Sequence, residues 1–230
     1  PVADLIKSYQ IKSKNVIAHI RKATFGQVSL ANTHPFMREL WGEYWLFAHN
    51  GHLQTLDELF SDNQQQYYRP VGTTDSEQTF CYILEKLRQK YDHKPTDEVL
   101  FHEIKLLTEK IRASGIFNFT LTNGDWMIAH ANTLLHYIIR QAPFGEAKLL
   151  DDDVSIDFTS VTTQQDRVAV IATMPLTVNE EWTQMARNEL VMFKEGEIIL
   201  RNCPDETMML SVEDALAMAR AVGAAANIVT

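Results

Sequence analysis

Apolar residues along this chain repeat with two different periods, and the period separates helical from extended segments. Where apolar side chains recur three or four positions apart, they line one face of a helix. Ser, Thr or Asp before such a run favours a helix start, and glycine after it favours a helix end. The pattern predicts helices at Pro1–Tyr9, Leu53–Phe60, Asp75–Tyr91, Pro95–Ser114 and Ser211–Ala221.

Shorter runs that are rich in β-branched and aromatic residues predict strands. Three of these runs are separated by Asn123-Gly124-Asp125 and by Asn132-Thr133, which predicts two successive hairpins, and Glu195-Gly196 predicts another. Roughly seven or eight strands joined mainly by hairpins favour antiparallel sheets with helices on their outer faces, an α+β fold. The predicted strands are Asn15–Ile20, Tyr44–His49, Ile116–Thr122, Trp126–Ala131, Leu134–Arg140, Arg167–Thr173, Glu189–Phe193 and Glu197–Leu200.

The stretch from Tyr44 to His52 is central, because a strongly apolar strand there runs directly into Asn50-Gly51. Asn-Gly is a strong signal for a type I′ hairpin turn, since both turn residues need a positive φ. A second interpretation is chemical: the Asn50 side-chain amide and the Gly51 N–H would lie side by side. Two converging donors of this kind form an oxyanion hole, which stabilises a developing negative charge.

Composition and charge exclude several classes of protein. The 230 residues carry a formal net charge of −9 with a pI near 5.3, whereas nucleic-acid-binding domains usually carry a basic face. No apolar run is long enough to span a bilayer, and no signal peptide opens the sequence. Two cysteines, Cys81 and Cys203, form no disulfide framework. We therefore expect a cytoplasmic protein with neither nucleic acid nor membrane as a partner, and with residues 1–230 in one domain.

Four short polar segments carry the chemical signal of the sequence. Taken singly, each has an ordinary explanation, such as a solvated Arg beside a turn glycine, or a Thr74/Glu77 capping box with Asp75 favoured by the helix dipole. The segments are His19–Gly26 (HIRKATFG), Asn32–Phe36 (NTHPF), Phe47–Gly51 (FAHNG) and Thr74–Glu77 (TDSE). In this order they resemble the glutaminase domain of class II glutamine amidotransferases, the N-terminal-nucleophile type, and most of all its stand-alone YafJ-like branch.

The resemblance implies a fold and a clamp for an amino acid. The fold is an αββα sandwich, Ntn-hydrolase-like, in which two mainly antiparallel sheets lie between helix layers. Arg21 would hold the α-carboxylate of the substrate, because a planar guanidinium binds a carboxylate in a bidentate manner. Asp75 would bind the α-ammonium group, and Thr24 would shape the pocket beside Arg21. Phe25 departs from better-known members, which often carry a His at this position.

The same resemblance implies a reaction on a small-molecule substrate, glutamine or a related γ-glutamyl compound. A thiolate would attack the side-chain amide and form a γ-glutamyl thioester, ammonia would leave, and water would hydrolyse the thioester. Asn50 and Gly51 would stabilise the oxyanion, and His34 would support the site. The resemblance implies no cofactor and no metal.

The expected nucleophile of this family is a Cys that becomes the first residue after methionine removal, with its own α-amino group as the base. Cys81 and Cys203 are both internal, and the sequence begins at Pro1. We therefore expect the nucleophile and its strand to be missing, and this chain as given to be inactive. One sheet would then have an unpaired edge, beside Asn15–Ile20 or Tyr44–His49, and such an edge favours pairing with another copy.

One alternative function is that of a metal-dependent hydrolase. Four histidines fall close together in the sequence and could include zinc ligands. His49 and His52 would have the predicted turn between them, which is an unfavourable geometry for two zinc ligands. Their spacing also matches no helical zinc motif. The histidines are His19, His34, His49 and His52.

A second alternative is a non-catalytic subunit that binds an amino acid. Arg21 and Asp75 without an active Cys would suit such a role. In the enzyme interpretation, we expect the acceptor of the ammonia to lie on a protein partner, because no acceptor domain is recognisable in these residues. The sequence does not identify the ammonia acceptor. It is also compatible with a homo-oligomer.

Overall fold

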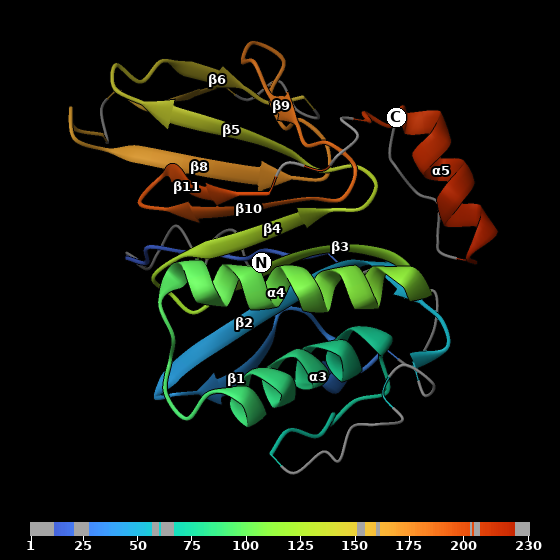
Figure 1. The fold of residues 1–230 in the computed structure, drawn as a ribbon. Helices are drawn as coiled ribbons and strands as arrows, with labels where there is room; N and C mark the ends of the chain where they lie inside the picture. Colours follow the sequence, from blue (N-terminus) through green and yellow to red (C-terminus); the bar gives the residue numbers. More distant parts are fainter. Residues whose placement is uncertain are drawn as a thin grey trace.

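Two antiparallel sheets and a layer of helices form the fold (Figure 1). The computed structural model describes residues 12–20, 28–56, 60, 67–150, 155–159, 162–202, 204 and 208–223. The larger sheet has the strand order β1-β2-β3-β4-β10-β11. Its strands are β1 (Phe36–Leu40), β2 (Glu43–Leu53), β3 (Gly115–Thr122), β4 (Met127–Ala131), β10 (Glu189–Lys194) and β11 (Glu197–Arg201).

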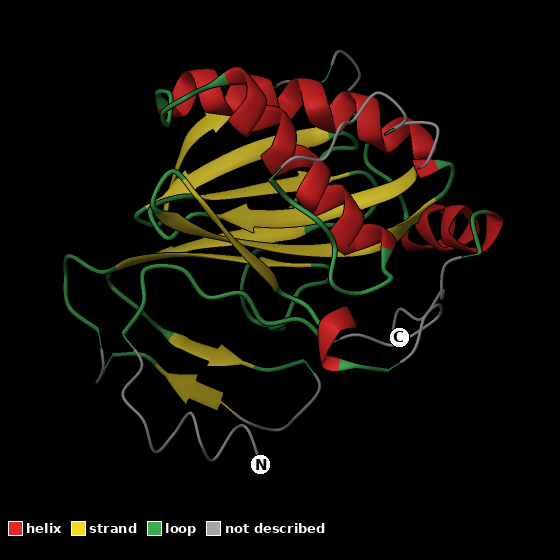
Figure 2. Ribbon diagram, turned by 90° about the horizontal axis from the view of Figure 1, so that it is seen from below, coloured by secondary structure: helices red, strands yellow, loops and turns green. Residues whose placement is uncertain are grey.

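The smaller sheet has the order β8-β5-β9, and a separate ribbon pairs β6 with β7. These strands are β5 (His136–Gln141), β6 (Glu146–Lys148), β7 (Ser155–Asp157), β8 (Arg167–Ala172) and β9 (Thr183–Gln184). Helices α3 (Asp75–Lys90) and α4 (Asp97–Ile111) cover one face of the larger sheet, as Figure 2 shows. Helix α5 (Val212–Ala221) stands apart from them at one end of the strands (Figure 1). The described residues also include two 3-10 segments, η1 (Leu30–Asn32) and η2 (Arg112–Ser114).

The alternation of side chains along β4 explains why the sheet has a core on each face. Ile128 belongs to the core beneath α3 and α4, which also contains Trp45 and Phe80. The neighbouring Ala129 and Ala131 belong to a second core, shared with β5, β8 and β10. Successive side chains of a strand point to opposite faces, so one strand serves both cores. This confirms the predicted α+β sandwich of two mainly antiparallel sheets.

Among the described residues, helices α3, α4 and α5 each begin after a capping side chain, and the sequence predicts two of these caps, Thr74 and Ser211. The side chain of Thr74 accepts from the Glu77 N–H at 3.2 Å, and Thr96 accepts from the Val99 N–H at 3.5 Å. Ser211 accepts from the Asp214 N–H at 3.1 Å. Each bond satisfies a backbone donor that the first helical turn leaves unpaired. Among the described residues, none of the helices is long and apolar enough to cross a membrane.

The Thr74/Glu77 capping box is only half formed, which corrects the prediction. The Glu77 carboxylate does not return to the cap but accepts from the N–H groups of Val71 at 3.0 Å and Gly72 at 2.6 Å. It also pairs with Arg38 of β1. Glu77 is 2% exposed, and a buried carboxylate needs such partners to compensate for lost hydration. Glu77 therefore ties the loop before α3 to the first strand.

The predicted Asn50-Gly51 turn is wrong, because both residues lie inside strand β2. Asn50 pairs with Asn118 and Gly51 pairs with Phe117 on β3. Gly51 has no positive φ, so the type I′ rule does not apply to it. A Cβ at Gly51 would lie 2.0 Å from the Ile116 carbonyl oxygen. Glycine is required here by the close approach of β3, which the local sequence does not reveal.

The second of the two predicted hairpins is also wrong. Strands β3 and β4 pair as predicted, but β5 leaves the larger sheet and pairs with β8 and β9. The N–H groups of Asn132 and Thr133 both donate to Asn118 Oδ1 at 2.8 Å. These donors are therefore engaged with a neighbouring strand, and the chain crosses to the smaller sheet at this point. The predicted hairpin of β10 and β11 is confirmed.

Residues Asn15–Ile20 form no strand, contrary to the prediction. Val16 is 72% exposed and Ile20 is 99% exposed, and within the described part of the chain no strand pairs with the segment. The Tyr44–His49 segment has no free edge either, because β2 pairs with β1 and β3. The strand also continues to Leu53, the first residue of the predicted helix Leu53–Phe60. The described part of that segment is helical at Leu56, whose carbonyl accepts from the Phe60 N–H at 2.8 Å. The predicted helix at Pro1–Tyr9 lies outside the described residues.

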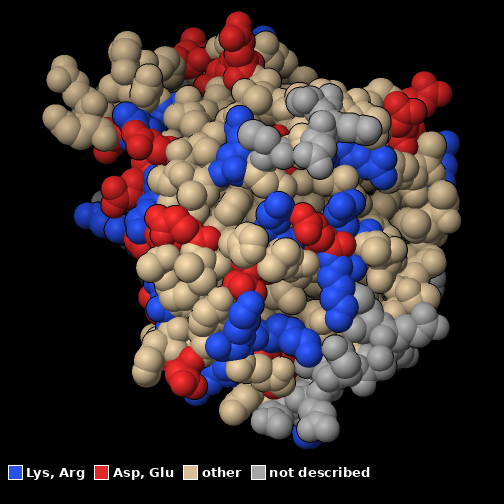
Figure 3. All heavy atoms as spheres, viewed as in Figure 1, with Lys and Arg blue, Asp and Glu red and all other residues tan. Residues whose placement is uncertain are grey.

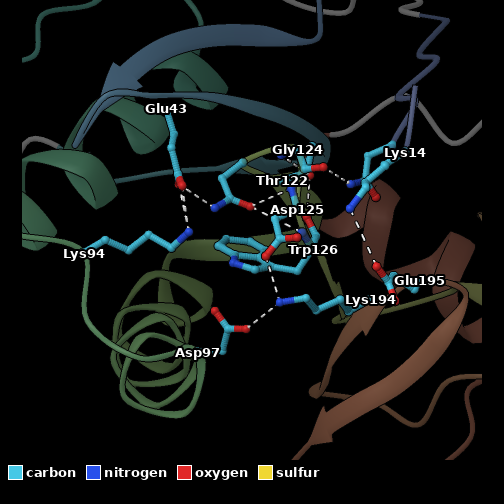
Figure 4. A network of polar contacts seen from close by, with 12 residues as sticks. Lys14, Glu43, Lys94, Asp97, Thr122, Gly124, Asp125, Trp126, Lys194 and Glu195 are labelled. Atoms are coloured by element: carbon cyan, nitrogen blue, oxygen red, sulfur yellow. Dashed lines mark hydrogen bonds and ion pairs between the residues drawn. The ribbon is translucent and has the colours of Figure 1, made fainter. Parts of the chain in front are cut away.

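A polar network joins the loops at the end of the larger sheet where β2 begins (Figure 4). Lys94 and Asn123 both contact the Glu43 carboxylate, at 2.8 and 2.6 Å. Lys194 contacts Asp125 at 2.8 Å and Asp97 at 3.2 Å, and its hydrogen bond to Asp125 holds the pKa of that carboxylate below its usual value. The network lies at the opposite end of β2 from Asn50.

Candidate active site

The candidate site forms where strand β2 ends beside the first turn of α3. The Leu53 N–H, at the end of β2, donates to Asp75 Oδ2 at 2.9 Å, and the Ser76 N–H donates to Asp75 Oδ1 at 2.9 Å. His52 Nδ1 lies 3.7 Å from Asp75 Oδ2. The Asp75 side chain is 23% exposed, so it can accept from a further donor. The structure thus brings Asp75 beside the strand that carries Asn50.

His49 connects this strand end to α3. Its Nδ1 lies 2.9 Å from Ser76 Oγ, and its Nε2 lies 3.0 Å from the Ile116 carbonyl oxygen. A carbonyl only accepts, so Nε2 carries the proton and the Ser76 hydroxyl donates to Nδ1. Burial lowers the pKa of His49, which favours this neutral ring although the charge of Asp75 opposes the shift. His49 therefore holds the turn that carries Asp75 against β2 and β3.

Asn50 lies on the face of β2 opposite to His49. Its side-chain Nδ2 donates to Thr173 Oγ1 at 3.3 Å, and its carbonyl accepts from Asn118 Nδ2 at 3.0 Å. The residue is exposed, and an amide nitrogen carries two N–H groups, so one donor is left for a substrate. Asn118 also donates to Thr133 Oγ1 at 2.8 Å. Asn50 is thus held by polar groups from β3 and from the end of β8.

The Asn32–Phe36 motif contributes a support for the loop before α3. Asn32 Oδ1 accepts from the Thr73 N–H at 2.8 Å, and Asn32 Nδ2 donates to Thr73 Oγ1 at 3.3 Å. A Cβ at Gly72 would lie 2.3 Å from Asn32 Oδ1, so the glycine makes room for this contact. The second motif and the Thr74–Glu77 motif therefore meet, although they are far apart in sequence.

His34 is buried beside the first motif. Its ring centroid lies 4.4 Å from that of His19 and 4.5 Å from that of Phe36. Arg21 and Thr24 lie outside the described residues, so their approach to Asp75 stays a prediction. The contacts of His19 with His34, of Asn32 with Thr73 and of His49 with Ser76 nevertheless bring the described parts of the four motifs into one region.

The four histidines of the metal-hydrolase alternative do not converge. Both ring nitrogens of His49 are engaged by Ser76 and Ile116, while the ring of His19 lies tilted against that of His34. Within the described part of the chain, no group of three or more His, Cys, Asp or Glu side chains could hold a metal ion. The geometry does not support this alternative.

Cys81 is a packed core residue. It lies in α3 with no exposed surface. Burial raises the pKa of its thiol to about 11, although Arg38 opposes the shift. The thiolate is the nucleophilic form of cysteine, so Cys81 is a poor nucleophile.

Two polar residues of this site, Ser76 and Asn118, are missed by the sequence analysis. Ser76 is hidden by its position, because a Ser in the first turn of a helix is ordinary. Asn118 carries a usable signal, since it is a polar residue between Phe117 and Phe119 in an apolar strand. A buried amide in such a strand must find partners, and it does so with Asn132 and Thr133.

We expect Ser76→Ala to lower the free energy of unfolding by about 1–3 kcal/mol, because it leaves His49 Nδ1 buried without a donor. Thermal or urea unfolding would measure the change. Thr79→Val is the matched control on the same helix, since the Thr79 hydroxyl is buried and has no hydrogen-bond partner among the described residues. Equal losses for the two variants would contradict the role given to the Ser76–His49 bond.

Comparison with known proteins identifies relatives along most of the chain. A putative glutamine amidotransferase of Haemophilus influenzae is 50% identical over 199 residues, which cover 86% of this chain and 66% of that protein. The putative glutamine amidotransferase YafJ of Escherichia coli is 48% identical over 201 residues, covering 87% of this chain and 77% of the relative. The chain thus spans about two thirds to three quarters of the length of these relatives.

A solved structure is also similar to this chain. The crystal structure of a predicted glutamine amidotransferase from Pseudomonas aeruginosa matches with a TM-score of 0.64 and 44% identity, covering 74% of this chain and 66% of the other. Residues 1–215 match the family of class-II glutamine amidotransferases. The match covers all four motifs and both sheets, and the chain belongs to this family.

Proposed function

We propose that the protein hydrolyses the side-chain amide of glutamine, or of a related γ-glutamyl compound, and releases ammonia. The observation that carries the proposal is the hydrogen bond from the Leu53 N–H to Asp75 Oδ2. It joins the strand of Asn50 and Gly51 to the carboxylate that the family resemblance assigns to the substrate ammonium group. Family membership supports chemistry on glutamine in general, and this contact supports our proposal that the reaction takes place at the end of β2.

The proposed substrate clamp has two charged ends. Asp75 accepts from the α-ammonium group through its exposed side, and Arg21 binds the α-carboxylate with a bidentate guanidinium. Thr24 shapes the pocket beside Arg21, and His34 supports the first motif through its contact with His19. A clamp of this kind fixes the position of the side-chain amide relative to the reacting groups.

The proposed reaction proceeds through a γ-glutamyl thioester. A thiolate adds to the amide carbon, the carbonyl oxygen becomes an oxyanion that Asn50 and Gly51 stabilise, and the C–N bond breaks as the nitrogen takes a proton and leaves as ammonia. Water then cleaves the thioester and restores the thiol. Cys81 is unsuited to this role because of its burial and raised pKa, so we assign the nucleophile to the N-terminal Cys of the family.

Ammonia release from L-glutamine by the intact protein tests this proposal directly. We expect activity that Cys81→Ala does not change, because the Cys81 thiol lies in the core and takes no part. Loss of activity in a folded Cys81→Ala variant would overturn the assignment of the nucleophile. Glutamine binding without ammonia release would favour an amino-acid-binding subunit. We further propose a cytoplasmic setting and an acceptor on a partner protein.

We expect Asp75→Asn to raise the KM for glutamine by about 10- to 100-fold, since it removes a charge-assisted hydrogen bond to the ammonium group. Steady-state kinetics would show whether KM changes more than kcat. Asp92→Asn is the matched control, because Asp92 is exposed in the loop after α3. An unchanged KM in a folded Asp75→Asn variant would remove Asp75 from the clamp. Arg21→Lys should also weaken binding, since a point charge cannot replace the guanidinium fork.

A further inference from the structure

A cavity of about 270 Å³ lies at the C-terminal end of α4, separate from the candidate active site. Its walls include residues of α4, β4 and β10, and β3 separates these strands from β2. The face that α4 covers carries many Lys and Arg side chains, with carboxylates among them (Figure 3). The charged and imidazole side chains that line the cavity are Lys105, Glu109, Arg112, His130 and Arg187.

Positively charged side chains outnumber negative ones in this cavity, although the protein has a net charge of −9. Lys105 has a carboxylate partner, Glu109, at 3.6 Å. Among the described residues, no carboxylate forms an ion pair with Arg112 or Arg187, and Arg187 Nε is buried without a hydrogen-bond partner. Two guanidinium groups from distant parts of the sequence therefore line one small cavity with hydrogen-bond donors unused.

His130 adds an acceptor to the same cavity. The residue is 1% exposed, and its Nδ1 lies 2.6 Å from the Phe117 carbonyl oxygen. Since a carbonyl only accepts, Nδ1 carries the proton and Nε2 is an acceptor. Nε2 is buried and has no hydrogen-bond partner among the described residues. Burial lowers the pKa of His130 to about 4, and the charge of Arg112 adds to the shift, so the ring is neutral at pH 7.

We propose that this cavity binds a small phosphate anion whose charged oxygens contact Arg112 and Arg187 and whose P–OH group donates to His130 Nε2. Guanidinium groups suit phosphate oxygens because their N–H groups form parallel pairs of charge-assisted bonds. The volume lies just below the usual range for drug-sized ligands, about 300–1,000 Å³. It therefore fits inorganic phosphate or a small phosphate monoester.

Calorimetric titration of the 230-residue chain with inorganic phosphate at low chloride tests the proposal. We expect saturable binding with a Kd below about 1 mM. Sulfate has similar size and charge but no O–H group, so we expect it to bind at least about tenfold more weakly. Glycerol phosphate distinguishes an ester from free phosphate by which of the two binds more tightly.

Three results of this titration would overturn the proposal. Absence of saturable phosphate binding would remove the site. Equal binding of sulfate would remove His130 as the acceptor. Equal binding of acetate would assign the cavity to carboxylates. Ammonia release does not enter the measurement, so its outcome is independent of the proposed glutaminase activity.

Variants of the two guanidinium residues locate the binding. We expect Arg112→Gln and Arg187→Gln each to weaken phosphate binding by about tenfold or more, while Arg187→Lys keeps part of the affinity. Arg88→Gln is the matched control, because Arg88 is exposed on α3 and does not line the cavity. Circular dichroism would confirm that each variant is folded. Parental affinity in both folded glutamine variants would place phosphate elsewhere and overturn the proposal.

Discussion

Replacing Asn50 with alanine is expected to lower the kcat for glutamine hydrolysis by about 10²–10³-fold, as is typical when one oxyanion donor is lost. The proposed role follows from the position of the amide near the end of β2. Its Nδ2 donates to Thr173 Oγ1, and its second N–H is available in an exposed residue. A donor already held in place needs little reorganisation as the negative charge develops.

The expected loss appears in kcat more than in KM, because the oxyanion exists only in the transition state and the intermediate. The fold should persist, since the bond from Asn118 Nδ2 reaches the backbone carbonyl of residue 50 and not the side chain. Steady-state kinetics of the intact enzyme with a thermal melt for each variant would separate the two effects.

Asn179→Ala is the matched control for this substitution. Asn179 contacts backbone groups of Lys148 and Glu146, away from β2, so we expect its kcat to equal that of the parent enzyme. A parental kcat in Asn50→Ala would leave Asn50 as a strand residue only. Equal losses in both variants would point to a general effect on the fold.

The helices could be predicted from the sequence because their signals are local. Thr74, Thr96 and Ser211 each cap the helix that follows, and capping depends on the next three residues only. The apolar positions of α3 and α4 repeat at helical spacing, and those residues form the core. Local chemistry and tertiary structure agree here, so the sequence is sufficient.

The strand connections could not be predicted with the same success, because their causes are tertiary. Asn132-Thr133 has the composition of a hairpin turn, yet both N–H groups donate to Asn118, which lies on a neighbouring strand. Val16 and Ile20 have strand composition, but composition does not supply a pairing partner. Strand pairing depends on contacts between distant residues, which an individual segment does not contain.

The candidate site rests on motif order, which predicts Asp75 and Asn50 as site residues. The structure brings Asp75 beside the end of the strand that carries Asn50, and the roles of the two side chains stay predictions. The supporting roles of His49 and Ser76 were not identified, because they depend on the distance between β2 and α3. The arginines that line the cavity beside α4, Arg112 and Arg187, belong to none of the four motifs.

Gly51→Ala is expected to cause the largest loss of stability among these variants. A Cβ at this position would lie 2.0 Å from the Ile116 carbonyl oxygen and 2.6 Å from His49 Nε2. Backbone atoms of β3 cannot rotate away as a flexible side chain could. Strands β2 and β3 would therefore have to separate, and overpacking of this kind costs about 1–3 kcal/mol, occasionally more.

The separation would also break the hydrogen bond between His49 and the Ile116 carbonyl. Leaving a buried hydrogen-bonding group without its partner costs about a further 1–3 kcal/mol. We therefore expect the free energy of unfolding to fall by about 3 kcal/mol or more. In a protein of this size each kcal/mol lowers Tm by about 2–4 °C, so the melt should shift by roughly 6–12 °C.

Gly145→Ala is the control that isolates this cause. Gly145 has no positive φ, and a Cβ there would meet no atom within 4 Å. Both substitutions add one methyl group and reduce the freedom of the unfolded chain equally, so the difference between the two melts measures the clash alone. We expect Gly145→Ala to stay within about 0.5 kcal/mol of the parent. If Gly51→Ala has the same Tm as Gly145→Ala, the close approach of β3 does not explain why residue 51 is a glycine. The presence of Gly51 beside Asn50 would then have to be explained by the chemistry of the site.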